Sequence, residues 1–384
     1  MKTQTPLTHS FMHVFSFVLA RAAHLNASDI HFAPRGTGGE VRLRVSGSLL
    51  VLQRFDDALQ WNDLIKVAKT RAGFSFTTGI AQDSRFSDLV TNCDYRASIV
   101  PVQIGDRACE QIVLRALPRN AHFELGKLGL PASAVSALRD ALNANSGLIV
   151  VTGPTGSGKT VTLMATLLEI ALDKYSVLTL EDPVEYALPG ITQVQISEKL
   201  SFAQGLRAFL RQDPDYILVG ETRDSETAKA LLQAASTGHV VLTTLHTNSA
   251  AEVFTRLSGL GVEEDLVRAN ASFICAQRLV PKLCPHCSED ALESVELVSR
   301  YFAHEISAEK RGELIPKRSF GCTVCNQTGV LGRVLLFEFI SKSAEQSSSS
   351  HQNKVLVQHS SLKNEAFKSL SKGEINALEA TAFC

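Results

Sequence analysis

One eight-residue run, Gly153-Pro154-Thr155-Gly156-Ser157-Gly158-Lys159-Thr160, matches the phosphate-binding P-loop pattern at every defined position. It follows an apolar run at 148–151, which is typical of a strand, and precedes a helical run at 161–172. In such loops the glycines let backbone N–H groups face the phosphates, Lys159 reaches the β- and γ-oxygens, and the Thr160 hydroxyl can ligate Mg²⁺. The run therefore predicts a nucleotide site, with ATP and Mg²⁺ as cofactors.

Strands and helices alternate around the P-loop. Apolar runs typical of strands lie at 147–152, 176–180, 216–219 and 240–244, with helical stretches between them. This alternation is typical of a parallel sheet covered by helices. The sequence therefore predicts an α/β core.

The residues before the P-loop have a different pattern. Short strands are expected within 28–52 and 95–117, around a helix near 58–72, which together indicate a small mixed α/β domain. Near the start, the apolar run 11–20 is too short to span a bilayer, and we prefer an amphipathic helix to a signal peptide there. That helix is predicted from apolar residues at three-and-four spacing, namely Phe11, Val14, Phe15, Val18, Leu19 and Ala22.

The charge balance of the chain excludes a global attraction to nucleic acid or to an anionic membrane. The 384 residues contain 38 Lys plus Arg and 39 Asp plus Glu. We also find no basic run interleaved with aromatic residues. No nucleic-acid partner is expected, and other partners must be recognised through local surfaces.

Acidic residues follow two of the predicted strands. Glu181, Asp182 and Glu185 come after the strand at 176–180, and Glu221 follows the next one along the chain. Ligands of doubly wound sheets bind at the carboxyl ends of the strands, so these carboxylates could converge on the nucleotide. Solvated loop carboxylates are the alternative, and the P-loop favours the functional interpretation.

Four of the eight cysteines form two Cys-x-x-Cys pairs, Cys284 with Cys287 and Cys322 with Cys325. Four thiolates at this spacing predict a closed structural Zn²⁺ site, with redox pairs or disulfides as the alternative. A helical insertion over 291–303 can occupy the gap between the two pairs.

Several ordered blocks resemble those of the type II secretion and type IV pilus ATPases. The resemblance covers about residues 10–340. The blocks are the P-loop, 179–185, 210–224, 237–248 and 277–284, together with 27–32 and 41–45 upstream. The family's fold implies a PAS-like N-terminal domain, a RecA-like ATPase core and a tetracysteine zinc module.

The patterns and the resemblance together divide the chain into five parts. These are an N-terminal PAS-like domain at 1–118, a linker at 119–130, the RecA-like core at 131–281, the zinc module at 282–335 and a tail at 336–384. The tail contains a Ser- and Gln-rich stretch from Ser341 to about His359, which we expect to be flexible.

The resemblance also implies roles for single residues. Glu185 would be the general base for the attacking water, and Glu221 would hold the outer shell of the metal. His239 and His246 would sense the γ-phosphate and couple it to domain motion. Their spacing alone implies none of this, because a lone histidine is more often structural.

Two arginines before the P-loop match the family's pattern for charge neutralisation at the γ-phosphate. They are Arg85 and Arg96, in the predicted N-terminal domain. Surface ion pairs are the alternative for both. The resemblance further implies a homohexamer. The composition itself gives no information on the number of subunits.

As a whole, the resemblance implies an ATP-hydrolysing hexameric motor that powers type IV pilus assembly or the related type II secretion system. It would be cytoplasmic, held peripherally at the inner membrane by a platform protein. The tetracysteine module favours assembly over retraction within this family. A pilus retraction ATPase, a DNA-translocating or conjugative ATPase and a non-catalytic scaffold are the alternatives, and the fibre or cargo stays open.

Overall fold

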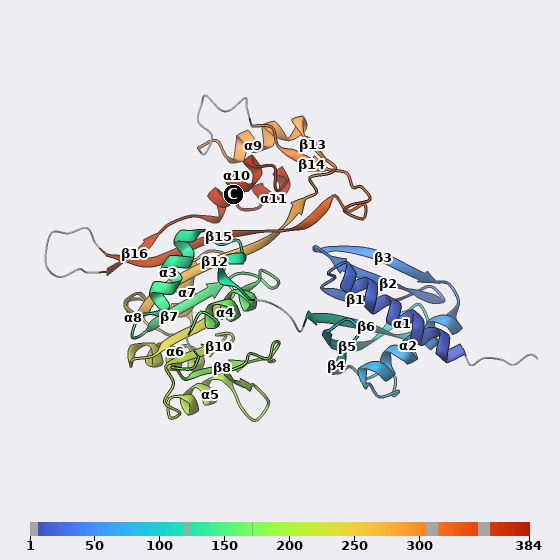
Figure 1. Ribbon diagram of the computed structural model, residues 1–384, viewed down its shortest axis with the longest axis horizontal. Coiled ribbons are helices and arrows are strands. Elements are labelled where there is room, and N and C mark those ends of the chain that lie inside the picture. The colour runs from blue at the N-terminus through green and yellow to red at the C-terminus, as the bar shows by residue number, and fades with distance from the viewer. Residues whose placement is uncertain (1–6, 119–122, 171, 305–313, 345–353) are drawn as a thin grey trace, which may run out of the picture. The chain divides into compact units, whose positions relative to one another are not determined.

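The computed structural model describes residues 7–118, 123–170, 172–304, 314–344 and 354–384. They belong to two compact units, Met1–Ala121 and His122–Cys384, which are coloured blue to teal and teal to red in Figure 1. Each unit is described by itself. Both combine helices with β-sheet, as the predicted mixed α/β class requires.

The first unit is built on one antiparallel six-stranded sheet in the order β3-β2-β1-β6-β5-β4. Two helices, α1 (Leu7–His24) and α2 (Ala58–Ala72), pack against each other and share one core with the sheet (Figure 1). The strands are β1 (Asp29–Arg35), β2 (Gly38–Val45), β3 (Ser48–Phe55), β4 (Gln82–Asp88), β5 (Cys93–Ile104) and β6 (Arg107–Pro118).

The two helices confirm the predictions made for them. In α1 the buried residues include Phe15, Val18 and Leu19, which lie on the predicted apolar face. Helix α2 has the predicted bounds because both of its ends are capped. The Asp57 side chain accepts a hydrogen bond from the backbone N–H of Leu59, and a left-handed Gly73 with φ of 71° ends the helix.

The second unit is built on an eight-stranded sheet in the order β16-β15-β12-β7-β11-β10-β8-β9. The six strands from β12 to β9 are parallel, which confirms the predicted α/β core, and β15 and β16 extend the sheet in antiparallel fashion. The bounds are β7 (Gly147–Thr152), β8 (Val177–Glu181), β9 (Thr192–Gln195), β10 (Tyr216–Val219), β11 (Val240–Leu245), β12 (Ala271–Leu283), β15 (Val330–Ala344) and β16 (Lys354–Gln358).

Helices cover both faces of this sheet. On β7, Leu148 and Val150 enter one apolar core while Ile149 and Val151 enter another, because successive side chains of a strand point to opposite faces. Helices α5 (Phe202–Phe209), α6 (Ser225–Ser236) and α7 (Glu252–Gly259) contribute to the first core, and α3 (Ala132–Leu142) and α4 (Lys159–Leu167) contribute to the second. The short helix α8 (Glu264–Asn270) follows α7.

The described part of the expected linker is packed against the second unit. A short 3₁₀ helix, η1 (Leu125–Lys127), lies in it, and both Leu125 and Leu130 are buried in the core beside α3 and α4. Residues 123–130 are therefore an entry segment of the second unit rather than an extended connection.

The C-terminal part of the second unit carries a two-stranded ribbon and several short helices. The elements are β13 (Ser288–Asp290), β14 (Lys317–Ser319), η2 (Leu292–Ser294), α9 (Val295–Tyr301), α10 (Leu362–Ser371) and α11 (Ala377–Thr381). Helix α9 lies within the predicted helical insertion. The rings of Phe302 and Phe367 are 5.2 Å apart, so the segment after α9 packs on α10.

Strand β15 runs through the expected boundary between zinc module and tail at 335/336. The two ends of the Ser-rich stretch are ordered, because Ser341 and Val357 pair across β15 and β16. The expectation of a flexible stretch from Ser341 to His359 was therefore wrong at both ends, and its middle, 345–353, lies outside the described residues.

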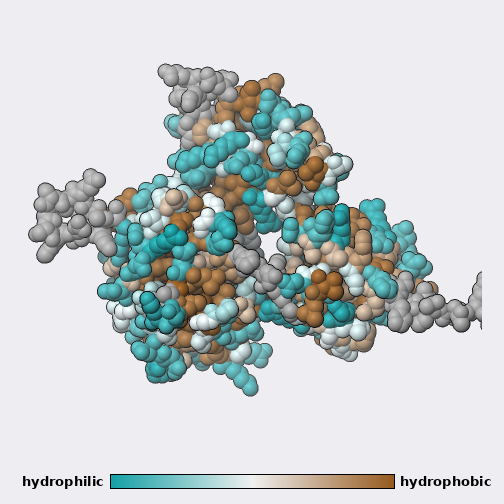
Figure 2. Space-filling model, in the orientation of Figure 1, coloured by the Kyte–Doolittle hydropathy of each residue, from teal (hydrophilic) through white to brown (hydrophobic). Residues whose placement is uncertain are grey.

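Among the described residues, none of the helices is long and apolar enough to cross a membrane. Figure 2 shows hydrophobic and hydrophilic residues interspersed on the visible face of each unit. The large clusters of apolar residues are the three buried cores.

Candidate active site

The P-loop connects the carboxyl end of β7 to the first turn of α4. Gly156 and Gly158 have φ of 79° and 89°, a left-handed conformation that side chains with a Cβ rarely adopt. A Cβ on Gly153 would lie 2.5 Å from the Gln277 carbonyl oxygen, so only glycine fits there. The loop therefore has the predicted strand-to-helix setting, and its glycines are required by the backbone path.

The Lys159 side chain is buried and folds back over the loop. Its Nζ donates hydrogen bonds to the carbonyl oxygens of Gly153, at 2.8 Å, and Pro154, at 3.0 Å. Burial lowers the pKa of Lys159 to about 8, although the nearby Glu221 carboxylate opposes the shift. An anion on this ammonium group would stabilise its charged form, as phosphate oxygens do in P-loop sites.

Ser157 supports the fit to a phosphate ligand. Its hydroxyl is buried and has no hydrogen-bond partner among the residues that the structure describes. Buried polar atoms are rarely left unsatisfied without a reason, and an unseen ligand is one such reason. Since this hydroxyl belongs to the loop itself, the donor set is suited to a nucleotide phosphate.

A residue that sequence reasoning did not assign to the site holds the P-loop from the neighbouring strand. Gln277 of β12 is fully buried, its Nε2 donates to the Ser157 carbonyl oxygen at 2.7 Å, and its Oε1 accepts from the Thr162 hydroxyl at 3.0 Å. The signal was available, because Gln277 begins the block at 277–284, but nothing in the sequence showed that β12 adjoins β7.

We predict that Gln277→Leu lowers the stability of the chain by about 1–3 kcal/mol, because it leaves the Ser157 carbonyl and the Thr162 hydroxyl unpaired in the interior. Urea unfolding of the full chain measures this. Gln233→Leu, at an exposed position of α6, is the matched control and should leave the unfolding midpoint unchanged. Equal midpoints for the two variants would contradict the supporting role of Gln277.

Three charged or titratable side chains meet at the same edge of the sheet. Glu221 follows β10, and His246 follows β11. The Glu221 carboxylate contacts His246 Nε2 at 3.9 Å and Arg223 Nη2 at 2.6 Å. Burial and the positive charge of Lys159 lower the pKa of His246. Because β7, β11 and β10 are parallel neighbours in the sheet, Glu221 and His246 lie at the same edge as the P-loop with Lys159.

The other predicted carboxylates lie further along this edge, after β8. Because β8 is the third strand from β7, its carboxyl end is about 14 Å from the P-loop strand. Glu181 is buried and accepts hydrogen bonds from the Thr179 hydroxyl and from Gln193 Nε2, while Asp182 is exposed. Glu185 is half-buried in the segment between β8 and β9.

The two cysteine pairs come together. The four Sγ atoms all lie within 4.8 Å of one another, with separations of 3.9 Å for Cys284–Cys322 and 3.8 Å for Cys287–Cys325. Four sulfurs bound tetrahedrally at about 2.3 Å from Zn²⁺ would lie about 3.8 Å apart. The cluster is therefore of the right size and chemistry for a structural zinc ion.

Backbone donors prepare one of these thiols to be a thiolate. Burial alone would raise the pKa of Cys325, but N–H groups of Cys322 and Gly329 at 3.1 and 3.2 Å, and the neighbouring cysteines, lower it to about 6. A lowered thiol pKa favours the thiolate that binds metal.

Comparison with known proteins agrees with this geometry. Residues 8–382 match the family described as "Type II/IV secretion system protein". The chain belongs to this family. The match covers nearly the whole sequence, including both units and the cysteine cluster.

Named relatives of the family include secretion and pilus proteins. A putative type II secretion system protein E of Escherichia coli is 38% identical over 348 residues, which cover 89% of this chain and 69% of that protein. The type IV pilus assembly ATPase PilB of Thermus thermophilus is 38% identical over 329 residues, covering 84% of this chain but 36% of PilB. This chain therefore spans about a third to two thirds of the length of these relatives.

Among solved structures, the pilus retraction motor PilT, determined with bound ADP, matches with a TM-score of 0.62 and 27% identity. The match covers 96% of each chain. The P-loop, the fold and the named relatives agree on an ATPase of the type II/IV secretion family.

The two arginines that the family pattern singled out lie in the first unit. Arg85 of β4 and Arg96 of β5 are exposed and face each other in register. Arg115 of β6 is the next residue in the same cross-strand row, and its Nε contacts Asp29 at 3.1 Å. Arg115 was not assigned from the sequence, because a cross-strand row is visible only once the pairing is known. Arg85 Nη2 also lies 3.6 Å from Asp94 Oδ2. This contact is a surface ion pair, the alternative that the sequence left open for Arg85.

His239 lies away from the cluster. It precedes β11, and its carbonyl oxygen accepts a hydrogen bond from the N–H of Gly147, the first residue of β7. The six residues of β11 separate His239 from His246 by about 20 Å along the strand. The His239 ring contacts the Ala234 carbonyl oxygen at 3.1 Å instead. The structure therefore does not bring the two histidines together at one γ-phosphate within a single chain.

Proposed function

We propose that this chain is an ATP-hydrolysing motor that powers type IV pilus assembly or the related type II secretion system. The observation that supports this most directly is the complete P-loop at the carboxyl edge of a parallel sheet, with Glu221 and His246 beside Lys159. The named relatives supply the biological setting.

In this proposal each side chain of the site has a part in phosphoryl transfer. Lys159 exchanges its bonds to the Gly153 and Pro154 carbonyls for bonds to the β- and γ-phosphate oxygens. The Thr160 hydroxyl and Glu221 would hold Mg²⁺, which when bound would supply charge neutralisation on these oxygens. Glu185 takes the proton of the attacking water, and Glu181 and Asp182 shape the nucleotide-binding edge. His246 senses the γ-phosphate.

Glu185→Gln tests the general-base assignment. We expect the variant to release phosphate from MgATP about a hundredfold or more slowly, because positioned general bases contribute about 10²–10⁴-fold. ATP binding should persist, since the P-loop is untouched. Steady-state phosphate release by the purified full-length chain gives the rate, and fluorescence titration with an ATP analogue gives the affinity.

Glu226→Gln is the matched control, because this α6 carboxylate is 72% exposed and contacts only a surface arginine among the described partners. It should hydrolyse ATP at the wild-type rate. Wild-type turnover by Glu185→Gln would remove the general-base assignment.

Glu221→Ala tests the assignment of Glu221. We expect this variant to hydrolyse ATP more slowly and to need a higher Mg²⁺ concentration for its half-maximal rate, because the metal loses a supporting carboxylate. Activity and Mg²⁺ dependence left intact would remove the assignment of Glu221.

We infer further that the first unit is a PAS-like domain and that the second contains a RecA-like core. Six copies would form a ring in which Arg85, Arg96 and Arg115 complete the charge neutralisation at a nucleotide. The ring would work at the cytoplasmic face of the inner membrane, held there by a platform protein, with no nucleic acid involved. The overall charge balance supports recognition through protein surfaces.

Pilus retraction is the second candidate, because the retraction motor PilT is similar over 96% of each chain. The tetracysteine cluster favours assembly or secretion, since the resemblance associates this module with those members.

A further inference from the structure

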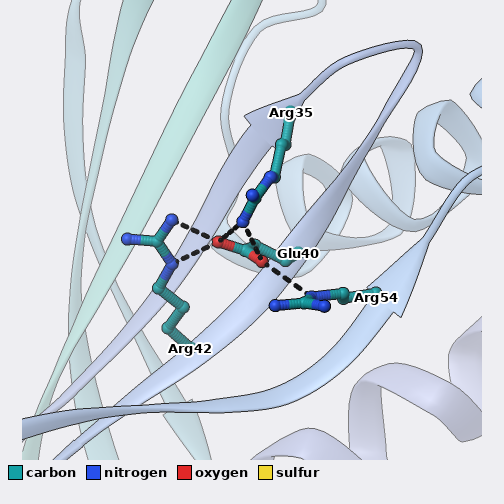
Figure 3. Close-up of polar contacts among 4 residues, drawn as sticks. All are labelled: Arg35, Glu40, Arg42 and Arg54. Carbon is teal, nitrogen blue, oxygen red and sulfur yellow. Dashed lines mark hydrogen bonds and ion pairs between the residues drawn. The ribbon is translucent and has the colours of Figure 1, made fainter.

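Three arginines of the first unit converge on one buried carboxylate, as Figure 3 shows. Glu40 of β2 is 1% exposed. Its oxygens accept hydrogen bonds from Arg42 Nε at 2.6 Å, Arg35 Nη1 at 3.2 Å and Arg54 Nε at 3.3 Å, and Arg42 Nη2 also contacts it. The arginines come from three adjacent strands, β1, β2 and β3.

The charges in this cluster do not balance. Glu40 carries one negative charge against three guanidinium groups, so the cluster is positive overall. Arg107 of β6 adds a fourth guanidinium at the turn between β1 and β2, where it donates to the carbonyl oxygens of Thr37 and Gly38. Burial would raise the pKa of Glu40, but its hydrogen bonds to Arg42 and the surrounding positive charge lower it overall, so the carboxylate is ionised.

A cavity of about 300 Å³ lies between two of these arginines. Its lining consists of Arg35, the turn 36–39, Arg54, Phe55 and Asp56. Three of the lining residues are glycines, which present only main chain. Two of them have no room for a side chain, because a Cβ on Gly38 would fall 1.8 Å from the Phe55 carbonyl oxygen and one on Gly39 would meet the Trp61 ring at 2.4 Å. Asp56 is the one acidic residue of the lining, and the two arginines outnumber it.

The two arginines that line the cavity have donors to spare. Among the described residues, Arg35 uses only Nη1 and Arg54 uses only Nε, both toward Glu40. Their side chains are 64% and 63% exposed. Glu40 therefore holds both guanidinium groups by one edge and leaves several N–H groups of each for another acceptor. A preorganised guanidinium loses less entropy when it binds an anion.

We propose that this cavity is a second anion site, which binds a phosphoryl group between Arg35 and Arg54. Guanidinium groups bind phosphate oxygens in pairs, and two of them around a main-chain wall are suited to a small tetrahedral anion. The site lies wholly in the first unit and shares no residue with the P-loop. The phosphoryl group can belong to a free phosphate compound or to a lipid headgroup.

Equilibrium dialysis with labelled inorganic phosphate tests the site. The protein is the full chain carrying Lys159→Ala, which weakens phosphate binding at the P-loop. We expect saturable phosphate binding that Arg54→Gln weakens about tenfold or more, because it removes a charge-assisted contact. Lys66→Gln is the matched control, since Lys66 has the same unit charge, lies in the same unit and is 64% exposed. It should change the affinity by less than about threefold.

Arg35→Gln is the second variant, and it should weaken binding to a similar extent. Arg42 lies on the same strand as Glu40 and donates to it from Nε at 2.6 Å. It is left in place in both variants so that the buried carboxylate keeps an ion pair. Unchanged thermal unfolding of each variant establishes that a loss of binding is not a loss of fold.

Sedimentation with vesicles separates the two sources of the phosphoryl group. Vesicles of phosphatidylcholine alone are compared with vesicles that also contain phosphatidylglycerol. Binding that depends on Arg54 in the vesicle arm identifies a lipid headgroup, and dependence in the dialysis arm alone identifies a free phosphate compound. If Arg54→Gln and Lys66→Gln behave alike in both arms, the proposed site is overturned.

Discussion

Lys159→Ala is expected to lower the rate of ATP hydrolysis by about a thousandfold, since single groups that stabilise the charge of a phosphoryl-transfer transition state contribute on this order. The reason lies in the position of the side chain. Lys159 is buried at the start of α4, and its ammonium group donates hydrogen bonds to two carbonyl oxygens of the loop. Alanine leaves the phosphate oxygens without this charge, and no neighbouring side chain from α4 can replace it.

Phosphate release by the purified full-length chain measures the loss. Lys229→Ala is the control, because Lys229 is an exposed lysine on α6 and its removal changes the net charge equally. Thermal unfolding should be similar for both variants. A Lys159→Ala protein with wild-type turnover would show that the P-loop is not the hydrolytic site.

Cys325→Ser is expected to remove the zinc ion and to destabilise the C-terminal part of the second unit. Cys325 is buried, and its thiol has the two backbone donors that favour the thiolate. Binding energies of structural zinc are about 10–16 kcal/mol, and they act as folding energy for small modules. The segment at risk lies between β12 and β15, where β13 and β14 offer only three residues each.

Metal analysis of protein purified without chelator should give about one zinc per wild-type chain and none for the variant. Thermal unfolding should begin at a lower temperature in Cys325→Ser. Cys109→Ser changes a cysteine of the first unit that lies outside the cluster, and it should retain full zinc content. Equal zinc in both variants, or none in the wild-type chain, would refute a structural zinc site.

Much of the second unit was predictable because local pattern and tertiary setting agree there. The P-loop motif requires a strand before it and a helix after it, and both β7 and α4 are present. Apolar runs gave the parallel strands, since a strand buried on both faces is apolar throughout. The four cysteines of the two predicted Cys-x-x-Cys pairs come together in one cluster, as a shared metal site requires.

What escaped prediction depends on which strands become neighbours. Gln277 supports the P-loop only because β12 lies next to β7, and Arg115 joins Arg96 only because β6 pairs with β5. The position of His239 was missed for a related reason. Two histidines seven residues apart lie at opposite ends of a strand when that strand is six residues long.

A buried threonine next to the site is satisfied by a partner. The Thr222 side chain is buried, and the hydroxyl of Thr243, on strand β11, lies 2.8 Å from its hydroxyl. A buried polar group costs little when it is hydrogen-bonded, so Thr222 is compatible with an intact site.

The most direct test of an ATP-driven assembly motor is the number of surface pili, counted by electron microscopy. Cells lacking the protein would be compared with cells whose only copy carries Lys159→Ala. We expect both strains to lose their pili, because assembly needs the nucleotide site and not the chain alone. An unchanged number of pili in the Lys159→Ala cells would contradict pilus assembly, and an excess would identify a retraction motor instead.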